Sequence, residues 1–383
     1  MSLKMEFVER ATTAGASVAE LCREYGVSRE TGHKWLRRFA AEGYGGLEER
    51  SRRPSSTPLA KAEDVVMSIL EAREAHPSWG PRKLVVLLRR RFGAAGPSAR
   101  TIARVLDRFG KLRKRRPRRE LSVVERAPHI EARAPNEVWT IDFKGWWRTA
   151  DGERFEPLTV RDSHSRFVLA ARVLDRERGE TVRDVLDELM RRYGVPQAIQ
   201  CDNGAPFVAV HARAGLSALS AWWVSLGIRI VRSRPGCPQD NGAHERMHRD
   251  MSGELQSVPA DTLTEQQRAL DRWRQIFNHV RPHDALGSRT PADVYVASPT
   301  RPRVRIPVYP PGWLVRKVAS SGEICVRSVG YFISSSLTGH LVGLESVDAL
   351  HSRVWFHDLD LGFVELAPDD LSIARAHPLA GRS

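Results

Sequence analysis

Residues 139–143 read Trp-Thr-Ile-Asp-Phe, and this run of β-branched and aromatic residues predicts a strand. The runs at 158–160 and 167–169 have the same character, and Asp-Ser-His-Ser at 162–165 predicts the turn between them. Helices and strands then alternate: a helix over 182–189, a strand over 197–201, a helix around Trp222 and Trp223, a strand over 228–231 and a helix over 242–255. This order predicts an α/β mixed sheet with helices on both faces.

Residues 1–50 predict a small all-α unit. Ser17 and Glu20 have the spacing of a capping box, Gly26 suits a turn, and Ser28 suits the start of a second helix. Helix, short glycine turn and helix form the helix-turn-helix pattern, although a plain helical hairpin would also explain it. In the first interpretation the second helix enters a DNA major groove with Arg29, Thr31, His33 and Lys34.

A second helical DNA-binding domain is expected over residues 57–120. Pro81 suits a first helical position, and residues 102–109 carry an apolar helical face. The region ends in a run at 111–119 in which seven of nine residues are basic. A solvated linker would explain that run, but its position beside two helical units favours contact with phosphates. The expected DNA contacts here are Arg82, Lys83, Arg113, Lys114, Arg115, Arg116, Arg118 and Arg119.

The charge of the chain is concentrated in that region. The 383 residues carry a formal charge of +14, and residues 51–130 alone contribute 20 basic and 7 acidic side chains, a net charge of +13. Such a local excess indicates a polyanionic partner. Membrane spans are not expected, because no run approaches the roughly 18 apolar residues that one needs. The N-terminus lacks a signal-peptide core and the four cysteines are far apart, so a cytoplasmic protein without disulfides is expected.

The C-terminal region, residues 305–370, is expected to be all-β. Five short apolar runs separated by glycine and serine lie between 326 and 366. Short strands at this spacing are typical of a small β-barrel. The whole chain is therefore expected to be multidomain, with N-terminal helical units, a central α/β domain at 133–300 and this barrel.

Three carboxylates stand out in the central region. Asp142 lies in the first strand, Asp202 ends a later strand, and Glu245 lies early in a helix, with 59 and 42 residues in the two intervals. Hard divalent cations prefer oxygen ligands, and two such ions can act together on a phosphate. Each acid alone is more often a solvated turn or a helix cap. Together, at two strand ends and a helix, they indicate a metal-dependent site for phosphoryl chemistry.

The words around these acids resemble the three catalytic motifs of DDE transposases and retroviral-type integrases. They are Trp-Thr-Ile-Asp at 139–142, Cys-Asp-Asn-Gly at 201–204 and Gln-Asp-Asn-Gly-Ala-His-Glu-Arg-Met-His-Arg at 239–249. Arg-Pro-His-Asp-Ala-Leu at 281–286 resembles a word found downstream in bacterial insertion-sequence transposases with an integrase-type core. Residues 20–29 resemble the first helix-turn-helix of the same proteins. The resemblance covers residues 1 to about 300.

This resemblance implies a ribonuclease-H-like core in which Asp142, Asp202 and Glu245 hold two Mg²⁺ ions, with Mn²⁺ as a substitute. It implies hydrolysis of a phosphodiester at an element end, then attack of the freed 3′-hydroxyl on target DNA. The implied partners are double-stranded DNA, both terminal inverted repeats and target, and a homodimer or higher multimer on that DNA. A bacterial protein associated with the nucleoid would follow.

The resemblance has two departures. The interval between Asp202 and Glu245 is wider than is usual, and the extra length falls around residues 209–222. The His/Cys zinc module that begins retroviral integrases has no counterpart here. Two alternatives stay open: a DNA-binding regulator on a retired transposase scaffold, disfavoured by the intact acids, and a nuclease that does not join DNA.

Several neighbours of the acids are candidates for other roles. Arg246, His248 and Arg249 are expected to contact DNA, because they lie within a turn of Glu245. Asp240 is expected to cap a turn and not to serve as a fourth acid. The tryptophans of this region are expected in the core in preference to base stacking: Trp146, Trp147, Trp222 and Trp223.

Overall fold

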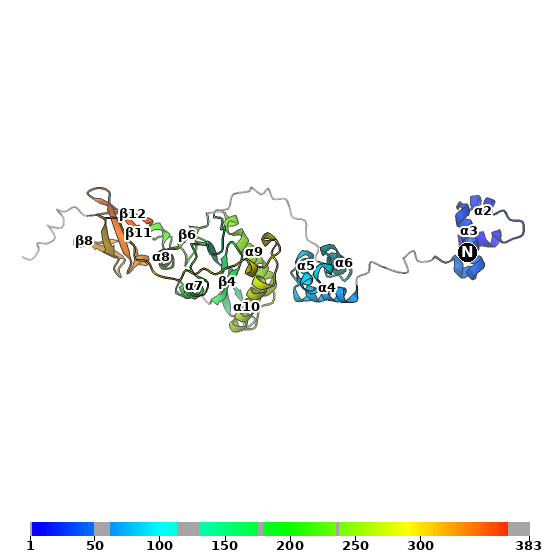
Figure 1. The fold of residues 1–383 in the computed structure, drawn as a ribbon, viewed down its shortest axis with the longest axis horizontal. Helices are drawn as coiled ribbons and strands as arrows, with labels where there is room; N and C mark the ends of the chain where they lie inside the picture. The colour runs from blue at the N-terminus through cyan, green and yellow to red at the C-terminus, as the bar shows by residue number, and fades with distance from the viewer. Residues whose placement is uncertain (1, 50–61, 113–129, 175–178, 235–236, 367–383) are drawn as a thin grey trace, which may run out of the picture. The chain divides into compact units, whose positions relative to one another are not determined.

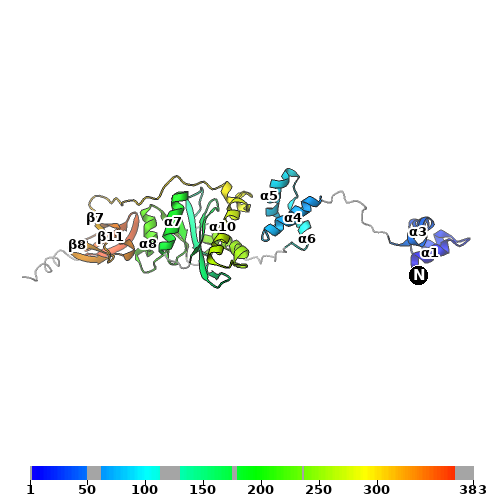
Figure 2. The same ribbon diagram turned by 90° about the horizontal axis from the view of Figure 1, so that it is seen from below.

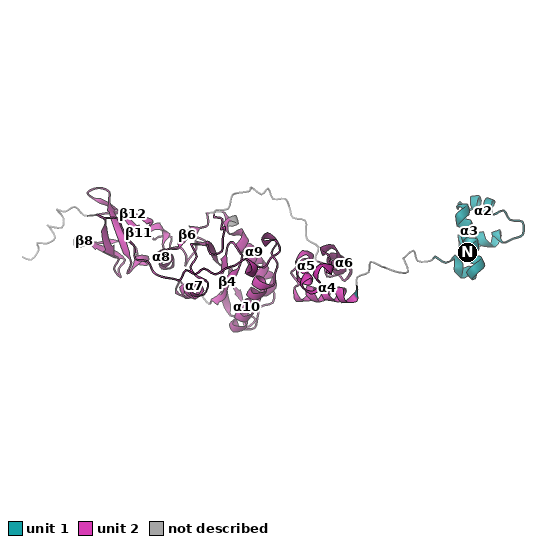
Figure 3. Cartoon of the chain, in the orientation of Figure 1, with its two compact units in different colours: residues 1–62 teal, residues 63–383 magenta. Residues whose placement is uncertain are grey.

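The structure is a computed structural model that describes residues 2–49, 62–112, 130–174, 179–234 and 237–366. It forms two compact units, Met1–Ala62 and Glu63–Ser383 (Figures 1 and 3). The basic residues expected to contact phosphates at 113–119 lie outside the described residues. Within the described parts, no helix is long and apolar enough to cross a membrane.

The first unit is the expected helix-turn-helix. Its helices are α1 (Leu3–Ala11), α2 (Val18–Glu24) and α3 (Arg29–Glu42), followed by a 3₁₀ turn over Gly43–Leu47. Gly26 has a φ of 63°, which glycine adopts without steric cost, and the Ser28 hydroxyl accepts from the Thr31 N–H at 3.1 Å. The expected capping box does not form, because Ser17 makes no side-chain cap hydrogen bond.

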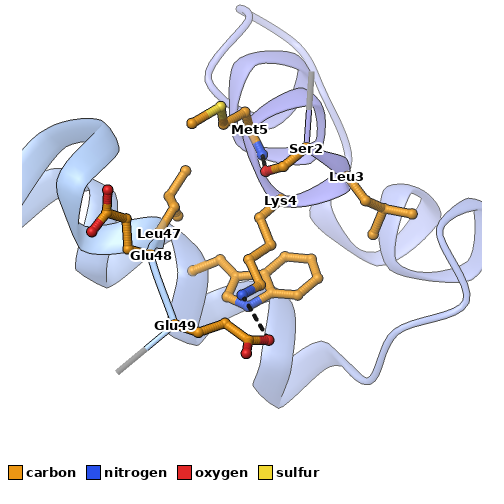
Figure 4. Close-up of a pocket in the computed structure, with 8 residues that line it drawn as sticks. Ser2, Leu3, Lys4, Met5, Leu47, Glu48 and Glu49 are labelled. Atoms are coloured by element: carbon orange, nitrogen blue, oxygen red, sulfur yellow. Dashed lines mark hydrogen bonds and ion pairs between the residues drawn. The ribbon is translucent and has the colours of Figure 1, made fainter. Parts of the chain in front are cut away.

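A hollow lies between the start of α1 and residues 47–49 (Figure 4). Its lining includes Leu3 and Leu47, and Lys4 pairs with Glu49 across it at 3.7 Å. Both charged groups reach solvent, so the pair contributes little stability. The hollow holds no cluster of chemically reactive side chains.

The second helical region begins unit 2. It contains α4 (Glu63–Ala75), α5 (Pro81–Phe92) and α6 (Ala99–Arg108). Pro81 opens α5 as expected, and Trp79, Leu84 and Ile102 are fully buried between the helices. Arg73 is buried here because its guanidinium donates to the Trp79 and Lys111 carbonyl oxygens. These helices form the all-α region that the sequence predicts.

The central region is built on one mixed sheet. Its strands are β1 (Val138–Phe143), β2 (Trp147–Arg148), β3 (Arg154–Asp162), β4 (Val168–Leu174), β5 (Ala198–Cys201) and β6 (Arg229–Arg232). The hydrogen-bonded order is β4-β3-β1-β5-β6, with β2 paired to the start of β3. The β1–β3 and β3–β4 pairs are antiparallel, whereas β1–β5 and β5–β6 are parallel. This arrangement confirms the predicted mixed sheet.

Helices cover both faces of this sheet, as Figure 2 shows for α7 and α10. The helices are α7 (Gly179–Tyr193), α8 (Ala218–Ser225), α9 (Gly242–Met251) and α10 (Leu263–His279). Trp139, Ile141 and Val160 pack against α7 and α8, whereas Phe155 and Val168 pack against α9 and α10. Successive side chains of a strand point to opposite faces, so each strand serves both layers.

The C-terminal region is all-β but is not the expected closed barrel. Its strands are β7 (Leu314–Lys317), β8 (Glu323–Val326), β9 (Val329–Phe332), β10 (Leu341–Ser346), β11 (His351–Phe356) and β12 (Leu359–Glu365). They form an open antiparallel sheet, β12-β11-β10-β7, and a separate β8–β9 hairpin. The short apolar runs therefore predicted the β structure of this region correctly, but the prediction of a closed barrel was wrong.

The open sheet is covered by the central region. Leu216 and Ala221 are buried in the same apolar cluster as Val342 and Phe356. The Arg213 guanidinium donates to the backbone oxygen of Phe363 at 2.7 Å, so it satisfies an acceptor on edge strand β12. The extra length that the sequence places around 209–222 thus lies against the C-terminal sheet and covers its edge.

Candidate active site

Two of the predicted acids lie at one edge of the central sheet. Asp142 is the fifth residue of β1, and Asp202 directly follows β5. The two strands are parallel neighbours in which Thr140 pairs with Gln200, so Asp142 and Asp202 lie at corresponding positions two residues further on. The carboxyl ends of parallel strands meet at the same edge, where sites of α/β proteins form.

The charge of Glu245 acts on Asp142 as that of Asp202 does, which places Glu245 near the same site. Burial raises the pKa of Asp142 from its usual value, and together with the negative charges of Asp202 and Glu245 it brings this pKa to about 7. The Phe143 N–H and Lys144 oppose this shift. Asp202 and Glu245 are exposed, whereas Asp142 is half-buried beside them. The three carboxylates therefore share one electrostatic environment that is open to solvent on one side.

The turn after Asp202 fixes the direction of its carboxylate. The Gly204 N–H donates to Asp202 Oδ1 at 3.0 Å, and the Asn203 amide donates to the Ser233 carbonyl at 2.9 Å. A Cβ on Gly204 would lie 3.3 Å from Asp202 Oδ2. A side chain at this position would push the Asp202 carboxylate by a few tenths of an ångström, so glycine leaves its direction undisturbed.

The loop before α9 is held by a different acid. Asp240 Oδ2 accepts from the Arg234 N–H at 3.0 Å and from Arg234 Nε at 2.9 Å. Asp240 thus closes a turn, in agreement with the interpretation of the sequence. The next residue, Asn241, donates from Nδ2 to Asp142 Oδ2 at 3.3 Å and so connects this loop to the first acid.

Helix α9 sits on a polar patch of the sheet. Thr140, Asp142, Thr159 and Arg161 alternate with apolar residues in β1 and β3, and all four face α9. The helix meets them with His244 and His248, which are both buried. The Thr159 hydroxyl lies 2.6 Å from His244 Nε2 and 2.7 Å from His248 Nε2. This patch is a hydrogen-bonded layer directly beneath Glu245.

Two arginines fix the position of α9. Arg161 is fully buried and donates from Nη1 to the Ala243 carbonyl at 2.7 Å, while burial lowers its pKa to about 9. Arg281, the first residue of the Arg-Pro-His word, is buried and pairs with Asp250 at 2.7 Å and Glu254 at 3.0 Å. One arginine thus holds the start of the helix and the other holds its end.

The expected DNA contacts have different surroundings. Arg29, His33 and Lys34 are exposed on α3, while Thr31 hydrogen-bonds the Ser28 hydroxyl at 2.9 Å within the helix cap. Arg82 on α5 and Arg246 and Arg249 on α9 are exposed. Lys83 is half-buried, and burial and the charge of Arg281 lower its pKa to about 8. His248 is buried under α9, so the expectation that it contacts DNA from the helix surface was wrong.

The tryptophans follow the prediction with one exception. Trp147, Trp222 and Trp223 are buried in the core. Trp146 is 53% exposed, with the Arg154 guanidinium 4.7 Å from its ring centroid, so its assignment to the core was wrong. The residue lies in the short connection between β1 and β2, where no helix covers it.

The sequence interpretation missed Thr140, Thr159 and Arg161. The signal was present in the alternation of polar and apolar residues in β1 and β3, because strand residues of one parity share a face. Their partners on α9 were equally visible, since His244 and His248 are four residues apart and face the same way as Met247 and Met251.

The site lies within regions that match known domain families. A model described as Integrase core domain matches residues 132–238, and a second with the same description matches residues 226–291. A model described as Helix-turn-helix domain matches residues 3–55, and one described as Homeodomain-like domain matches residues 31–106. The two integrase matches together contain all three acids.

Proteins of bacterial insertion elements are similar in sequence. The insertion element IS476 uncharacterized 39.2 kDa protein of Xanthomonas euvesicatoria is 27% identical over 73% of this chain and 78% of that protein. The insertion element IS407 uncharacterized 31.7 kDa protein of Burkholderia multivorans is 27% identical over 65% of this chain and 86% of that protein. Among solved structures, the trimeric HTLV-2 integrase catalytic core domain in complex with magnesium is 15% identical, with a TM-score of 0.34, over 43% of this chain and 100% of that chain.

Proposed function

Since this chain belongs to the bacterial insertion-sequence transposases of the DDE, retroviral-integrase-like superfamily, we propose that it cuts and joins DNA at the ends of a mobile element. The reaction begins with hydrolysis of a phosphodiester at the element end. The freed 3′-hydroxyl then attacks a phosphodiester of the target DNA. Neither step forms a bond between protein and DNA, so the site needs no nucleophilic serine or tyrosine.

The observation that carries this proposal is the coupling of the three carboxylates. Burial and the charges of Asp202 and Glu245 raise the pKa of Asp142 to about 7, so the ionised form of Asp142 is disfavoured beside the other two acids. A divalent cation removes that repulsion, and Mg²⁺ takes oxygen ligands of this kind. We assign two Mg²⁺ ions, with Mn²⁺ as a substitute, to Asp142, Asp202 and Glu245. When bound, they supply positive charge beside the reacting phosphate.

The protein's own residues hold this acid set in place. Gly204 orients Asp202, and Asn241 contacts Asp142. The polar patch holds α9, the helix that carries Glu245. Exposed Arg246 and Arg249 flank Glu245 on the same helix and are suited to phosphates of bound DNA. Fixed groups of this kind lower the reorganisation that the reaction requires.

The helical regions supply recognition of the element ends. Arg29, His33 and Lys34 are exposed on the second helix of a helix-turn-helix, the element that enters a major groove. The proposed partners are terminal inverted repeats and target DNA. Two ends must be joined in one complex, so we expect a homodimer or a higher multimer on DNA. Paired-end joining by a protein that sediments as a monomer on that DNA would contradict this expectation.

A strand-transfer assay with Mg²⁺ tests the proposed function. The purified protein is given labelled DNA with the flanking repeats and a plasmid target, and Asp202→Asn is run beside it. Joined products that disappear in the variant are the expected result. Asp151→Asn serves as a matched control, because Asp151 is an exposed turn acid between β2 and β3.

Two other outcomes would overturn the proposal. Salt-sensitive DNA binding without cleavage would indicate the regulator on a retired scaffold. Cleavage that requires Asp202 but yields no joined product would indicate a nuclease. The helix-turn-helix supports DNA binding in all three cases, so only the covalent products separate them.

A further inference from the structure

The polar patch under α9 contains one nitrogen whose surroundings suit a cation. Building on the cation site of the proposed function, we propose that His248 Nδ1 is a nitrogen ligand of the ion held at Asp142, whereas His244 only positions it. His244, His248 and Asp142 together have donor atoms within 4.8 Å of one another. Their hydrogen bonds separate the roles of the two rings.

The Thr159 hydroxyl decides where the ring protons lie. It donates its single hydrogen to the Asp142 carbonyl oxygen at 3.0 Å. With its hydrogen on that carbonyl, we assign the hydroxyl as the acceptor from both imidazoles, whose Nε2 atoms lie 2.6 Å and 2.7 Å away. Both His244 and His248 consequently carry their proton on Nε2, and in the neutral rings both Nδ1 atoms present a lone pair.

The lone pair of His244 has a partner. The Thr140 hydroxyl lies 2.8 Å from His244 Nδ1 and 3.3 Å from the Arg161 carbonyl oxygen, and we assign its hydrogen to the closer Nδ1 because Nε2 carries the ring proton. His244 is fully buried. Both nitrogens of this ring are thus engaged by threonines of the sheet. His244 has no atom left for a cation, and its contacts fix the Thr159 hydroxyl that His248 uses.

The lone pair of His248 faces a carboxylate. Its Nδ1 lies 3.9 Å from Asp142 Oδ2, which is too far for a hydrogen bond. Two atoms that both carry lone pairs gain nothing from each other unless a cation lies between them. Ligands at about 2.1 Å from one ion are separated by about 3.0 Å at right angles and about 4.2 Å when opposite. The observed 3.9 Å is close to the separation of opposite ligands.

The other side of the ring has the arrangement typical of metal-binding histidines. Such a ring usually donates its second N–H to an oxygen that fixes its tautomer and orientation. For His248 this oxygen is Thr159 Oγ1, which is anchored to the backbone of Asp142 itself. The ligand pair Asp142–His248 is therefore held as one unit through Thr159.

Pulsed electron paramagnetic resonance of the full-length protein with Mn²⁺ tests this inference. Echo modulation from ¹⁴N is expected in the wild type, and labelling histidine with ¹⁵N is expected to change it to the ¹⁵N frequency. The variant His248→Gln is expected to lose this modulation and to bind Mn²⁺ about 10-fold to 100-fold more weakly. The control His244→Gln is expected to keep it.

The outcomes distinguish this inference from the cation site on which it rests. Mn²⁺ that binds the wild type without histidine modulation would overturn the role of His248 and leave the carboxylate site intact. Absence of Mn²⁺ binding would overturn both. Modulation that survives in His248→Gln but is lost in His244→Gln would contradict the inference, because it would make His244 the ligand. The experiment on ¹⁵N-labelled wild type does not depend on any variant. If His248→Gln misfolds, His248→Asn is a second variant for the same test.

Discussion

The two faces of the central sheet are built from the same strands but differ in role: one is packed with apolar side chains, and the other is a polar, hydrogen-bonded layer. On one face Trp139, Ile141 and Val160 pack into an apolar cluster with α7 and α8. On the other face, at the same strand ends, Thr140 and Thr159 meet the histidines of α9 through hydrogen bonds. The apolar face stabilises the fold by removing surface from water, whereas the polar face holds a costly buried acid in position.

This difference shows how one strand can serve stability and chemistry at once. Alternate residues of β1 point in opposite directions, so Ile141 can be buried while its neighbour Asp142 reaches the site. Changes on the two faces are therefore expected to separate, with losses of activity on one side and losses of stability on the other.

The largest expected effect is on the polar face. Asp142→Asn should lower strand-transfer activity by about 10³-fold, because the site loses one of the three anionic oxygen ligands proposed for it. The fold should persist, since the amide removes a half-buried charge that its neighbours disfavour. Strand-transfer rates and circular dichroism of the variant and the wild type check both parts. A variant that unfolds would show that the two faces are not separable.

The next effect belongs to the apolar face. Leu186→Ala in α7 should destabilise the core by about 2–5 kcal/mol, because it leaves a cavity at a fully buried position. Mn²⁺ affinity of the folded variant should match that of the wild type. Denaturant unfolding and Mn²⁺ titration measure the two quantities. A large loss of Mn²⁺ affinity in a folded variant would contradict the separation.

Removal of the divalent ion should lower the stability of the folded protein only where the acids of the polar face can bind the ion. At an ion concentration 100 times its dissociation constant, binding stabilises the folded protein by about 2.7 kcal/mol. A chelator should therefore lower the melting temperature of the wild type and should leave Asp202→Asn nearly unchanged. Differential scanning calorimetry with and without the chelator provides the comparison. An equal shift in both proteins would place the ion elsewhere.

In metal-free protein, stability is also expected to depend on pH. The pKa of Asp142 rises from 3.8 to about 7 on folding, so the folded state binds its proton more readily. Through this group, stability decreases as pH rises from about 4 to about 7. His248 makes stability increase as pH rises, because burial lowers its pKa from 6.5 to about 3 on folding.

The contribution of Asp142 is isolated by subtraction. The stability of the wild type minus that of Asp142→Asn should decrease as pH rises through this window, and His248 cancels to first order because both proteins contain it. Unfolding midpoints in the presence of a chelator measure this difference. A difference that increases with pH would mean that the carboxylate is stabilised, and not destabilised, by its surroundings.

The sequence predicted the elements of the site better than their environment. Asp142, Asp202 and Glu245 could be proposed as the site from local sequence motifs, and the order of strands and helices predicted the mixed sheet. The burial of His248 was missed because most residues around it in the sequence are charged, although Met247 and Met251 mark the inward face of α9. A residue's partners across the sheet come from tertiary packing, which no local pattern contains.

The C-terminal region shows the same limit. Short apolar strands predicted a β domain there, but closure depends on which edge strands pair. The edge of β12 accepts a hydrogen bond from Arg213, which lies about 150 residues earlier in the chain. That partner lies in the extra length after Asp202, so two features that were separate in the sequence are one contact in the fold.

The most direct test of this account is the location of a bound ion. Crystals of the full-length protein grown with Mn²⁺ should show an anomalous scattering peak beside Asp142, on the side shared with Asp202 and Glu245. A peak at that position would establish that the polar face is the catalytic face. Mn²⁺ bound only elsewhere, with these three carboxylates free of it, would contradict the account.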